Sequence, residues 1–386
     1  MVAGRTDRVK RQPIGNIVPL QLPPMTKPML LAEFTRLPPA YRARRVDGLA
    51  SGIDQVAGRA RTSHRFLRYQ WFAAALSAYG GEAQTLVVEG ERGLVAALPL
   101  VRVGPRALGA ATVPGCYWPF RSFPKAAGLD AAAFDALVDA LAQSIAVLRI
   151  GPVYDGDPAT GGLIAAARRR GWAVIDRFIA DSYLFDMAGA AQEGWPRNST
   201  LRKNRFHEKH LAEHGALDWR FLGGAALADG GFDQLADVEQ KSWIAARTDG
   251  RDAKFMATGH GAFWRAVAVD PVLADMLHAA LLTVNGAPAD FSFDMNAGAI
   301  KYAIANSYDP AFAKHSPGKL LYYRNLVSAL ADGIATVDWG AGDSGYKQVI
   351  GATKGPAIRD WLIVRPGAMA LAARAFGGLW RRSGQG

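Results

Sequence analysis

The sequence predicts a mixed α/β (α+β) protein of two tandem domains, each with a mixed, mostly antiparallel sheet flanked by helices. Two observations predict this class. Short apolar segments typical of strands alternate with longer segments typical of helices along most of the chain. Both halves open with helices, carry one hairpin signal and close with a helix followed by a strand. A length of 386 residues also fits two domains of ordinary size.

The first half is predicted to be a domain of residues 29–180 that follows a flexible basic tail, residues 1–28. The tail is rich in proline and basic side chains and has no periodicity. Strands at 85–88 and 94–98 flank glycine-containing turn residues and form a hairpin. The remaining elements are a helix near 130–147, a strand at 147–150, a helix that ends before Gly171 and a strand at 172–175.

The second half is predicted to be a domain of residues 181–365, followed by a basic C-terminal segment, residues 366–386. Asn285-Gly286 between two apolar runs is a strong hairpin signal. The other expected elements are a helix at 197–214, a strand at 217–222, helices near 231–246 and 260–269, and several strands from 275.

The stretch from residue 303 to 352 carries the strongest functional signal. A strand over 303–309 leads into the small-residue loop 316–318, which opens a helix, and a second strand follows at 337–340. The first N–H groups of a helix lack partners within it and lie at its positive end, and proline favours the first helical position. We therefore expect the loop to hold a pyrophosphate while a thioester lies along the neighbouring strand.

Several short motifs around this stretch resemble a known superfamily. They are Glu239 with Trp243, then Ser307-Tyr308-Asp309-Pro310, the run from His315 to Leu321, Asp338-Trp339-Gly340-Ala341-Gly342, and Gly345-Tyr346-Lys347. The motifs resemble the GNAT acyltransferases. Residues 181–365 as a whole resemble the FemAB-related branch, which includes cellulose-biosynthesis and holdfast-polysaccharide modifying proteins. The first half has no counterpart to the 316–318 loop, so we expect the chemistry in the second half and a noncatalytic first half that shapes the acceptor cleft.

The resemblance implies acetyl-CoA, or another acyl-CoA, as co-substrate. The common GNAT phosphate loop has Arg or Gln, two variable residues, Gly, one further residue, and Gly or Ala. Here Ala313 and Ser316 replace the first two fixed residues and Gly318 holds the last, while Lys314 or Lys319 could supply the missing charge. The predicted donor-binding residues are Asn306, Ser307, His315, Ser316, Pro317, Gly318, Lys319 and Leu320.

Tyr346, Lys347 and Asp309 are the predicted catalytic residues. Tyr346 matches the GNAT segment whose tyrosine protonates the departing thiolate, and a phenol has a proton available at neutral pH. Lys347 could stabilise the thiolate or a substrate anion. Asp309, at a strand end near the loop, is the expected general base. The alternatives are a turn-anchoring tyrosine, a surface lysine and a capping aspartate.

The acceptor side is expected to contain acidic and aromatic residues of the second half. Asp294, Glu239, His315 and Asp338 are further candidates for the base, and Trp243 and Trp339 would suit stacking on a sugar face. The predicted substrate-binding residues are Glu239, Trp243, Asp294, Asp338 and Trp339. The tryptophans could equally belong to the core.

The composition excludes several classes of function. Of the net charge of +11, three charges lie within residues 1–11 and four in the arginines from 365 to 382, so nucleic acid is not an expected partner. A cluster of five basic residues between 197 and 209 is either a solvated helix face or a landing surface for an anion. His207 and His210 are one residue too close for the H-E-x-x-H zinc motif, and no metal is expected.

The single cysteine, Cys116, excludes an internal disulfide framework. No signal peptide and no run of about 18 apolar residues is visible. We therefore expect a cytoplasmic protein. The basic C-terminal segment could lie on the inner face of the membrane as a peripheral contact, or pack on the domain.

These observations predict an acyl-CoA-dependent acyltransferase, in the first instance an N-acetyltransferase. Its acceptor would be an amine or hydroxyl of a cell-envelope or exopolysaccharide sugar, or of a lipid-linked saccharide precursor, which the resemblance alone implies. Two alternatives stay open. One is an aminoacyl-tRNA-dependent, FemX-like transferase, which a long coiled-coil arm would favour. The other is a noncatalytic GNAT-like protein that binds a nucleotide second messenger.

Overall fold

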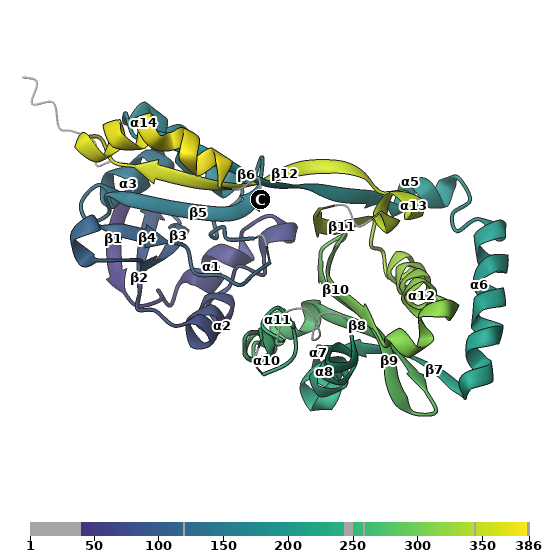
Figure 1. Cartoon of the computed structure of the whole chain (residues 1–386). Helices are drawn as coiled ribbons and strands as arrows, with labels where there is room; N and C mark the ends of the chain where they lie inside the picture. The colour runs from purple at the N-terminus through teal and green to yellow at the C-terminus, as the bar shows by residue number, and fades with distance from the viewer. Residues whose placement is uncertain (1–39, 119, 243–249, 258, 343–344, 384–386) are drawn as a thin grey trace, which may run out of the picture. The chain divides into compact units, whose positions relative to one another are not determined.

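One mixed sheet of twelve strands runs through the residues that the computed structural model describes, which are 40–118, 120–242, 250–257, 259–342 and 345–383 (Figure 1). The strand order is β1-β2-β3-β4-β5-β12-β6-β11-β10-β9-β8-β7, and neighbours are antiparallel except β4 with β5 and β10 with β11. The strands are β1 (Arg42–Asp47), β2 (Ala83–Gly90), β3 (Gly93–Arg102), β4 (Ala110–Thr112), β5 (Val147–Tyr154), β6 (Ala173–Asp186), β7 (Leu217–Gly223), β8 (Leu277–Val284), β9 (Ala287–Ala297), β10 (Ile300–Tyr308), β11 (Thr336–Ala341) and β12 (Thr353–Val364). The predicted fold class is confirmed.

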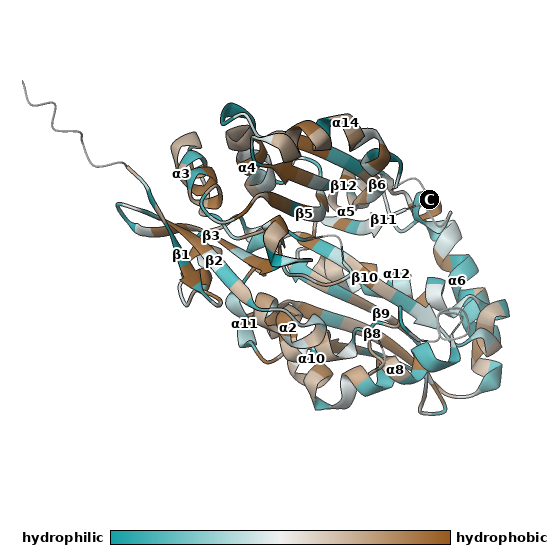
Figure 2. Ribbon diagram, turned by 60° about the vertical axis from the view of Figure 1, so that its left-hand side comes forward, coloured by the Kyte–Doolittle hydropathy of each residue, from teal (hydrophilic) through white to brown (hydrophobic). Residues whose placement is uncertain are grey.

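Helices cover both faces of this sheet. In the second half, α12 packs on one face of β8, β9 and β10, and α8 and α11 pack on the other (Figure 1). The helices are α1 (Ile53–Gly58), α2 (Tyr69–Tyr79), α3 (Ala131–Leu141), α4 (Pro158–Arg169), α5 (Met187–Gln192), α6 (Asn198–Leu211), α7 (Gly224–Ala226), α8 (Phe232–Lys241), α10 (Gly261–Val267), α11 (Pro271–Met276), α12 (Pro317–Ala331), α13 (Tyr346–Ile350) and α14 (Ala368–Arg382). Strand β5 is strongly apolar, whereas α6 is mostly hydrophilic (Figure 2).

The two halves repeat one strand order and exchange their closing strands. Four antiparallel strands followed by a parallel one form β1-β2-β3-β4-β5 in the first half and β7-β8-β9-β10-β11 in the second. The sixth place beside β5 is taken by β12, and the place beside β11 is taken by β6. Strands β6 and β12 also pair with each other from Thr353↔Leu184 to Val364↔Ala173. The tandem arrangement is therefore joined by a strand exchange.

The two predicted hairpins are confirmed as β2–β3 and β8–β9. Asn285 and Gly286 both adopt positive φ, 51° and 77°, as a tight two-residue turn requires. The predicted short strand at 172–175 is the start of the much longer β6. The expected domain boundary at 180 falls inside β6, and the division into residues 29–180 and 181–365 stays a prediction.

The largest hydrophobic cluster contains residues of both halves. The ring of Trp118 lies 5.0 Å from that of Tyr302 on β10, and Trp71 lies 6.0 Å from Trp264. Such edge-to-face pairs add to the apolar area that they bury. Aromatic residues of the first half therefore pack against β10, the strand that carries the functional signal.

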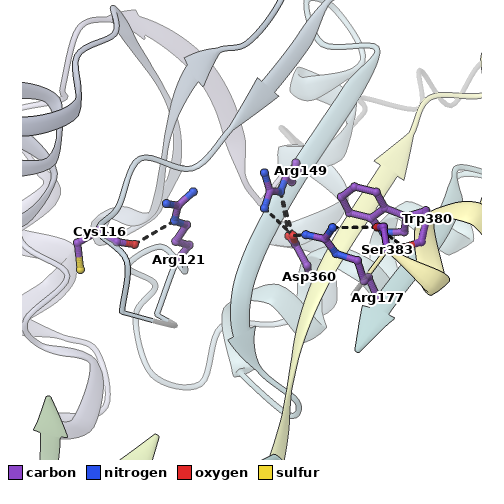
Figure 3. Close-up of polar contacts among 7 residues, drawn as sticks. All are labelled: Cys116, Arg121, Arg149, Arg177, Asp360, Trp380 and Ser383. Carbon is purple, nitrogen blue, oxygen red and sulfur yellow. Dashed lines mark hydrogen bonds and ion pairs between the residues drawn. The ribbon is translucent and has the colours of Figure 1, made fainter. Parts of the chain in front are cut away.

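A buried carboxylate joins the three central strands. Asp360 on β12 is fully buried and accepts hydrogen bonds from Arg149 on β5 and Arg177 on β6, with shortest distances of 2.7 and 2.6 Å (Figure 3). The guanidinium of Arg177 lies 4.1 Å from the centre of the Trp380 ring on α14. One carboxylate thus fixes both strands that flank β12 and helps to seat the final helix.

Helix α14 packs its small residues on β6 and exposes a broad apolar face. A side chain at Gly377 would approach Ile175 to 3.2 Å, so this position requires a close fit. Leu371, Phe376 and Leu379 are each about two-thirds exposed. No helix of the described residues is long and apolar enough to cross a membrane.

Replacing Asp360 should destabilise the fold. In Asp360→Asn, two arginines lose their shared charge partner in a site where Arg177 is largely buried, and we expect a loss of about 3–5 kcal/mol in the free energy of unfolding. Asp139→Asn is the matched control, because its pair with Arg170 is exposed and should contribute less than about 1 kcal/mol. Urea denaturation of both variants checks this; equal, small losses would contradict the assigned role.

Candidate functional site

Strands β10 and β11 separate after a short parallel pairing. They pair only between 300–302 and 336–338. Beyond this point β10 follows β9 with a register shift between Ala303 and Ala305, while β11 follows β6 with its own irregularity after Asp338. The edge of β10 that faces the gap therefore has no strand partner in the described sheet. Its backbone groups can pair with an extended ligand, as in strand addition.

A cavity of about 680 Å³ lies beside this strand split, between β10, the start of α12, and α13. Its lining residues are Asn306, Ser307, Tyr308, Ala313, Ser316, Gly318, Lys319, Tyr322, Tyr346, Val349 and Ile350. The structure thus brings together Tyr346 and five of the residues predicted to bind the donor. Pro317 and Leu320 are buried at the helix start instead.

The start of α12 has the features of an anion site. Ser316 is in the left-handed conformation with φ of 53°, and Pro317 is the first helical residue. A side chain at Gly318 would lie 3.3 Å from the Tyr308 ring and 3.4 Å from Asn306 Oδ1. Ser307 Oγ is buried and has no hydrogen-bond partner among the described residues. A helix start with the N–H of Gly318 at its positive end and an unsatisfied hydroxyl beside it suits a phosphate-containing ligand.

Positive charge surrounds this helix start. Burial and, to a smaller extent, the charge of Lys203 on α6 lower the pKa of Lys319. Burial also lowers the pKa of His207, and Lys203, Lys319 and His315 lower it further. Nε2 of His315 lies 2.9 Å from Nε2 of His214. A bound anion would relieve the repulsion between these basic side chains. This favours the interpretation that the basic residues of α6 bind an anion over the interpretation that they form a solvated helix face.

Tyr346 and Lys347 have different surroundings at the start of α13. Tyr346 is 44% exposed and lines the cavity. The ammonium of Lys347 is buried and donates to the carbonyls of Trp339, Ala341 and Gly342 at 2.9, 3.1 and 2.5 Å. These hydrogen bonds of Lys347 hold α13 against the end of β11. The chemical role of Lys347 stays a prediction.

Asp338 lies at the last paired position before the split, on the opposite face from the cavity. Its neighbours Val337 and Trp339 pack in the cluster that contains residues of α12, and strand alternation directs Asp338 the other way. It accepts a hydrogen bond from the N–H of Gly340 at 2.7 Å. Burial raises the pKa of Asp338 to about 6. A carboxyl with this pKa can accept a proton near neutral pH.

The other predicted acidic residues have structural partners. Asp309 caps the following turn by accepting the N–H of Ala311 at 2.9 Å, so it fits the capping alternative. Asp294 is buried 3.0 Å from the ammonium of Lys301. Glu239 is buried and accepts the N–H groups of Lys254 and Phe255, both at 2.8 Å. None of the three lines the cavity.

The two tryptophans predicted to stack on a sugar are Trp339 and Trp243. Trp339 is buried, with its ring 5.9 Å from that of Phe185 and 5.5 Å from that of Tyr322, so it fits the core alternative. Trp243 lies outside the described residues. The roles of both in substrate binding stay predictions.

Several lining residues were missed in the sequence. Tyr322, Val349 and Ile350 have helical positions that look like ordinary core or surface residues. The Tyr322 hydroxyl is buried without a hydrogen-bond partner among the described residues. No sequence signal distinguishes such a tyrosine from a packed one. Within the described ranges, no group of three or more His, Cys, Asp or Glu residues could hold a metal ion.

The second half matches a known protein family over part of its length. Residues 198–348 match the model of a family described as an acetyltransferase (GNAT) domain. Residues 198–348 are therefore similar to a GNAT acetyltransferase domain. The superfamily resemblance is confirmed, while the cellulose and holdfast branch stays a prediction. Among curated proteins, none matches the chain.

Solved structures share the fold over most of the chain. A conserved protein of unknown function from Bacteroides thetaiotaomicron VPI-5482 has 13% identity and a TM-score of 0.50, covering 82% of this chain and 97% of that one. FemX has 11% identity and a TM-score of 0.54, covering 86% and 100%. At these identities the likeness shows the fold alone.

Asp338 should make stability depend on pH. Its folded-state pKa is raised from 3.8 to about 6, so its contribution is fully present below pH 3.8 and is lost as pH rises through 6. Asp338→Asn lacks this penalty. Its stability relative to wild type should therefore increase by about 2.4 kcal/mol between pH 4 and pH 8. Denaturation at both pH values checks this, with the exposed Asp237→Asn as control. A difference that does not vary with pH would show that Asp338 is ionised normally.

Proposed function

We propose that the chain is an acyl-CoA-dependent acyltransferase, in the simplest case an N-acetyltransferase, that acts on an amine or hydroxyl. The observation that carries this proposal is that one cavity combines the unpaired edge of β10, the start of α12 and Tyr346. A CoA thioester has an amide-containing arm, a pyrophosphate and a leaving thiolate. The three features match these groups in that order.

On the donor side, the free backbone groups of residues 303–308 would hold the pantetheine arm. The N–H of Gly318 would donate to the pyrophosphate, because Pro317 has no N–H and the N–H of Ser316 donates to the carbonyl of Ala313 at 3.1 Å. Lys319 and Lys203 would neutralise the charge of the pyrophosphate. When bound, acetyl-CoA supplies an activated carbonyl carbon. Val349 and Ile350 line the same cavity, and their apolar side chains would contact the acyl group.

On the acceptor side, the split lets a nucleophile approach from the face opposite to the cavity. The new N–C or O–C bond forms at the thioester carbon as the C–S bond breaks. Asp338 takes the proton that the acceptor loses, because its pKa of about 6 leaves it mostly ionised at neutral pH. Tyr346 donates its phenolic proton to the departing sulfur. Asp338 thus replaces Asp309 as the proposed base, since Asp309 is committed to a cap.

The proposed acceptor is a sugar of the cell envelope or of an exopolysaccharide, or its lipid-linked precursor. The motif resemblance supports the sugar. The exposed apolar face of α14, flanked by Arg374, Arg381 and Arg382, supports work at the inner face of an anionic membrane. A cytoplasmic protein with this peripheral contact would meet lipid-linked saccharides at the bilayer surface.

An aminoacyl-tRNA donor is the second candidate. The basic face of α6 beside the cavity favours it, because an RNA backbone would neutralise the same charges. The longest described helices, α12 and α14, have 15 residues, so the described chain contains no long coiled-coil arm. A noncatalytic protein that binds a nucleotide messenger would use the same anion site but would not need Tyr346 or Asp338.

Donor binding can be measured directly. We expect saturable heat on titration of the purified chain with acetyl-CoA, longer acyl-CoAs and free CoA. Gly318→Glu should abolish it, because a carboxylate would enter the space beside Asn306 and Tyr308 and repel phosphate. Gly161→Glu adds the same charge on α4, where a side chain meets nothing within 4 Å, and should bind like wild type. If no CoA compound binds, the hypotheses of a tRNA-dependent transferase and of a messenger-binding protein take precedence.

Tyr346 should act on the chemical step and not on donor affinity. With any acceptor that releases free CoA thiol, Tyr346→Phe should lower kcat by about 10²-fold or more while the Kd for acetyl-CoA stays within about twofold. Tyr308→Phe, in the same cavity, is the matched control and should keep kcat. Thiol release in stopped-flow assays separates the two variants; unchanged kcat in Tyr346→Phe would remove the tyrosine from the mechanism.

A further inference from the structure

A second cavity, of about 390 Å³, lies in the first half and shares no lining residue with the donor cavity. It is enclosed by the end of α2, the end of β3, the segment 112–117 and the side chain of His260 from the second half. Its lining residues are Ala75, Tyr79, Gly80, Val101, Val103, Thr112, Val113, Pro114, Gly115, Cys116, Tyr117, Arg121 and His260. The proposed function uses none of them.

Arg121 enters this cavity without an acidic partner among the described residues. Its Nε donates to the carbonyl of Cys116 at 3.2 Å, and no other hydrogen bond holds the guanidinium within the described chain. The nearby Arg149 and Arg177 share the one carboxylate of Asp360 (Figure 3). Burial lowers the pKa of Arg121, and Arg149 lowers it further, while Asp360 opposes this shift. A partly buried cation with no acidic side chain in contact with it is a site that favours an anion.

The fold makes room for this arginine. A side chain at Gly115 would lie 2.9 Å from Arg121 Cγ, so glycine lets the arginine stem pass. The backbone N–H of Arg121 donates to the carbonyl of Pro152 at 3.0 Å, which fixes the residue to the end of β5. The guanidinium is thus held by its own backbone and by Nε, leaving its two terminal nitrogens available for a ligand.

The rest of the cavity wall is uncharged at neutral pH. Burial lowers the pKa of His260 to about 4 and raises that of Cys116 to about 12. The Tyr117 ring lies 4.2 Å from that of His260, and the Tyr79 hydroxyl lies 2.9 Å from His260 Nδ1. Thr112 Oγ1 is buried with no hydrogen-bond partner among the described residues. The cavity therefore combines one cation, one unsatisfied hydroxyl and apolar or aromatic walls.

We propose that this cavity binds a small molecule with an apolar body through a single carboxylate. The terminal nitrogens of Arg121 present the fork that pairs with a carboxylate in two parallel hydrogen bonds. The Thr112 hydroxyl supplies a further donor. The walls of valine, proline and aromatic rings bury the body of the ligand, as in small-molecule sites generally. This binding is independent of acyl transfer.

The first test uses benzoate as the probe, with its neutral analogue benzamide and inorganic phosphate as comparison. In isothermal titration, benzoate should bind saturably to the full chain, and benzamide and phosphate at least about tenfold more weakly. Arg121→Gln should weaken benzoate by about 10- to 100-fold, because a charge-assisted hydrogen-bond pair is lost. Arg42→Gln removes the same charge from exposed β1 and should bind like wild type. Equal binding by Arg121→Gln, or preference for phosphate, would overturn the proposal.

A second pair of variants guards against misfolding of Arg121→Gln. Val103 lies at the cavity rim and Val272 lies on α11 outside it, and their exposed fractions are 40% and 41%. Val103→Glu should weaken benzoate at least about tenfold through charge repulsion, while Val272→Glu should not. The same affinity in both variants would place the benzoate site elsewhere.

Cys116 provides an independent readout of position, because it is the one cysteine of the sequence and lines this cavity. Its reaction with the uncharged reagent 4,4′-dithiodipyridine should slow as benzoate saturates the site, with the midpoint found by titration. Saturable benzoate binding that leaves this rate unchanged would overturn the assignment to this cavity. Neither readout involves CoA, so failure here and failure of the proposed function are distinguishable.

Discussion

The exchange of β6 and β12 between the two halves is the constraint on which the rest of the structure depends. Because β6 pairs with β12 along one edge and with β11 along the other, β11 is fixed by the strand that continues out of the first half. Strand β10 is fixed instead by β9, and its register shift turns it away after residue 303. Neither strand can close the gap without breaking its other ladder. The split at which we propose that the donor binds therefore follows from the way in which the halves are joined.

The same join separates the chemistry of the two faces of the sheet. The face toward α12 has the helix start, Lys319 and the basic side chains of α6, and it suits an anionic donor. The other face has Asp338, with aromatic residues of the first half such as Trp118 packed against Tyr302 nearby. Low polarity there raises the pKa of Asp338, whereas the same carboxyl on the basic face would be held ionised. A base and a phosphate site can thus lie close together without interfering.

Sequence reasoning succeeded where local chemistry decides the structure. Asn285-Gly286 determines its hairpin because few other residue pairs tolerate two positive φ values. Pro317 and Gly318 likewise mark the start of α12. It failed for β6, because the charged residues between 176 and 181 look like a loop when their partners are unknown. Arg177 and Asp360 are 183 positions apart, and no local pattern shows that they meet.

The candidate site was predictable to a similar degree and for the same reason. Residues proposed to contact a ligand through the backbone, such as Gly318, leave a local signature in the loop. Acidic side chains do not, because an aspartate in a cap, in an ion pair and at a reactive centre looks the same in the sequence. Asp309 is in a cap, Asp294 is in an ion pair and Asp338 is the proposed base, and burial and partners distinguish them.

The buried network beneath α12 explains why so many polar candidates near the site are structural. Asp294 on β9 accepts from Lys301 of β10 at 3.0 Å and from Asn325 of α12 at 2.6 Å. Apolar residues of equal volume could hold these elements together at least as strongly, but they would allow α12 to shift along the strands. Hydrogen bonds with fixed donors and acceptors specify one position of the helix. Since the proposed anion site is the first turn of that helix, its placement relative to the open edge of β10 is determined by this network.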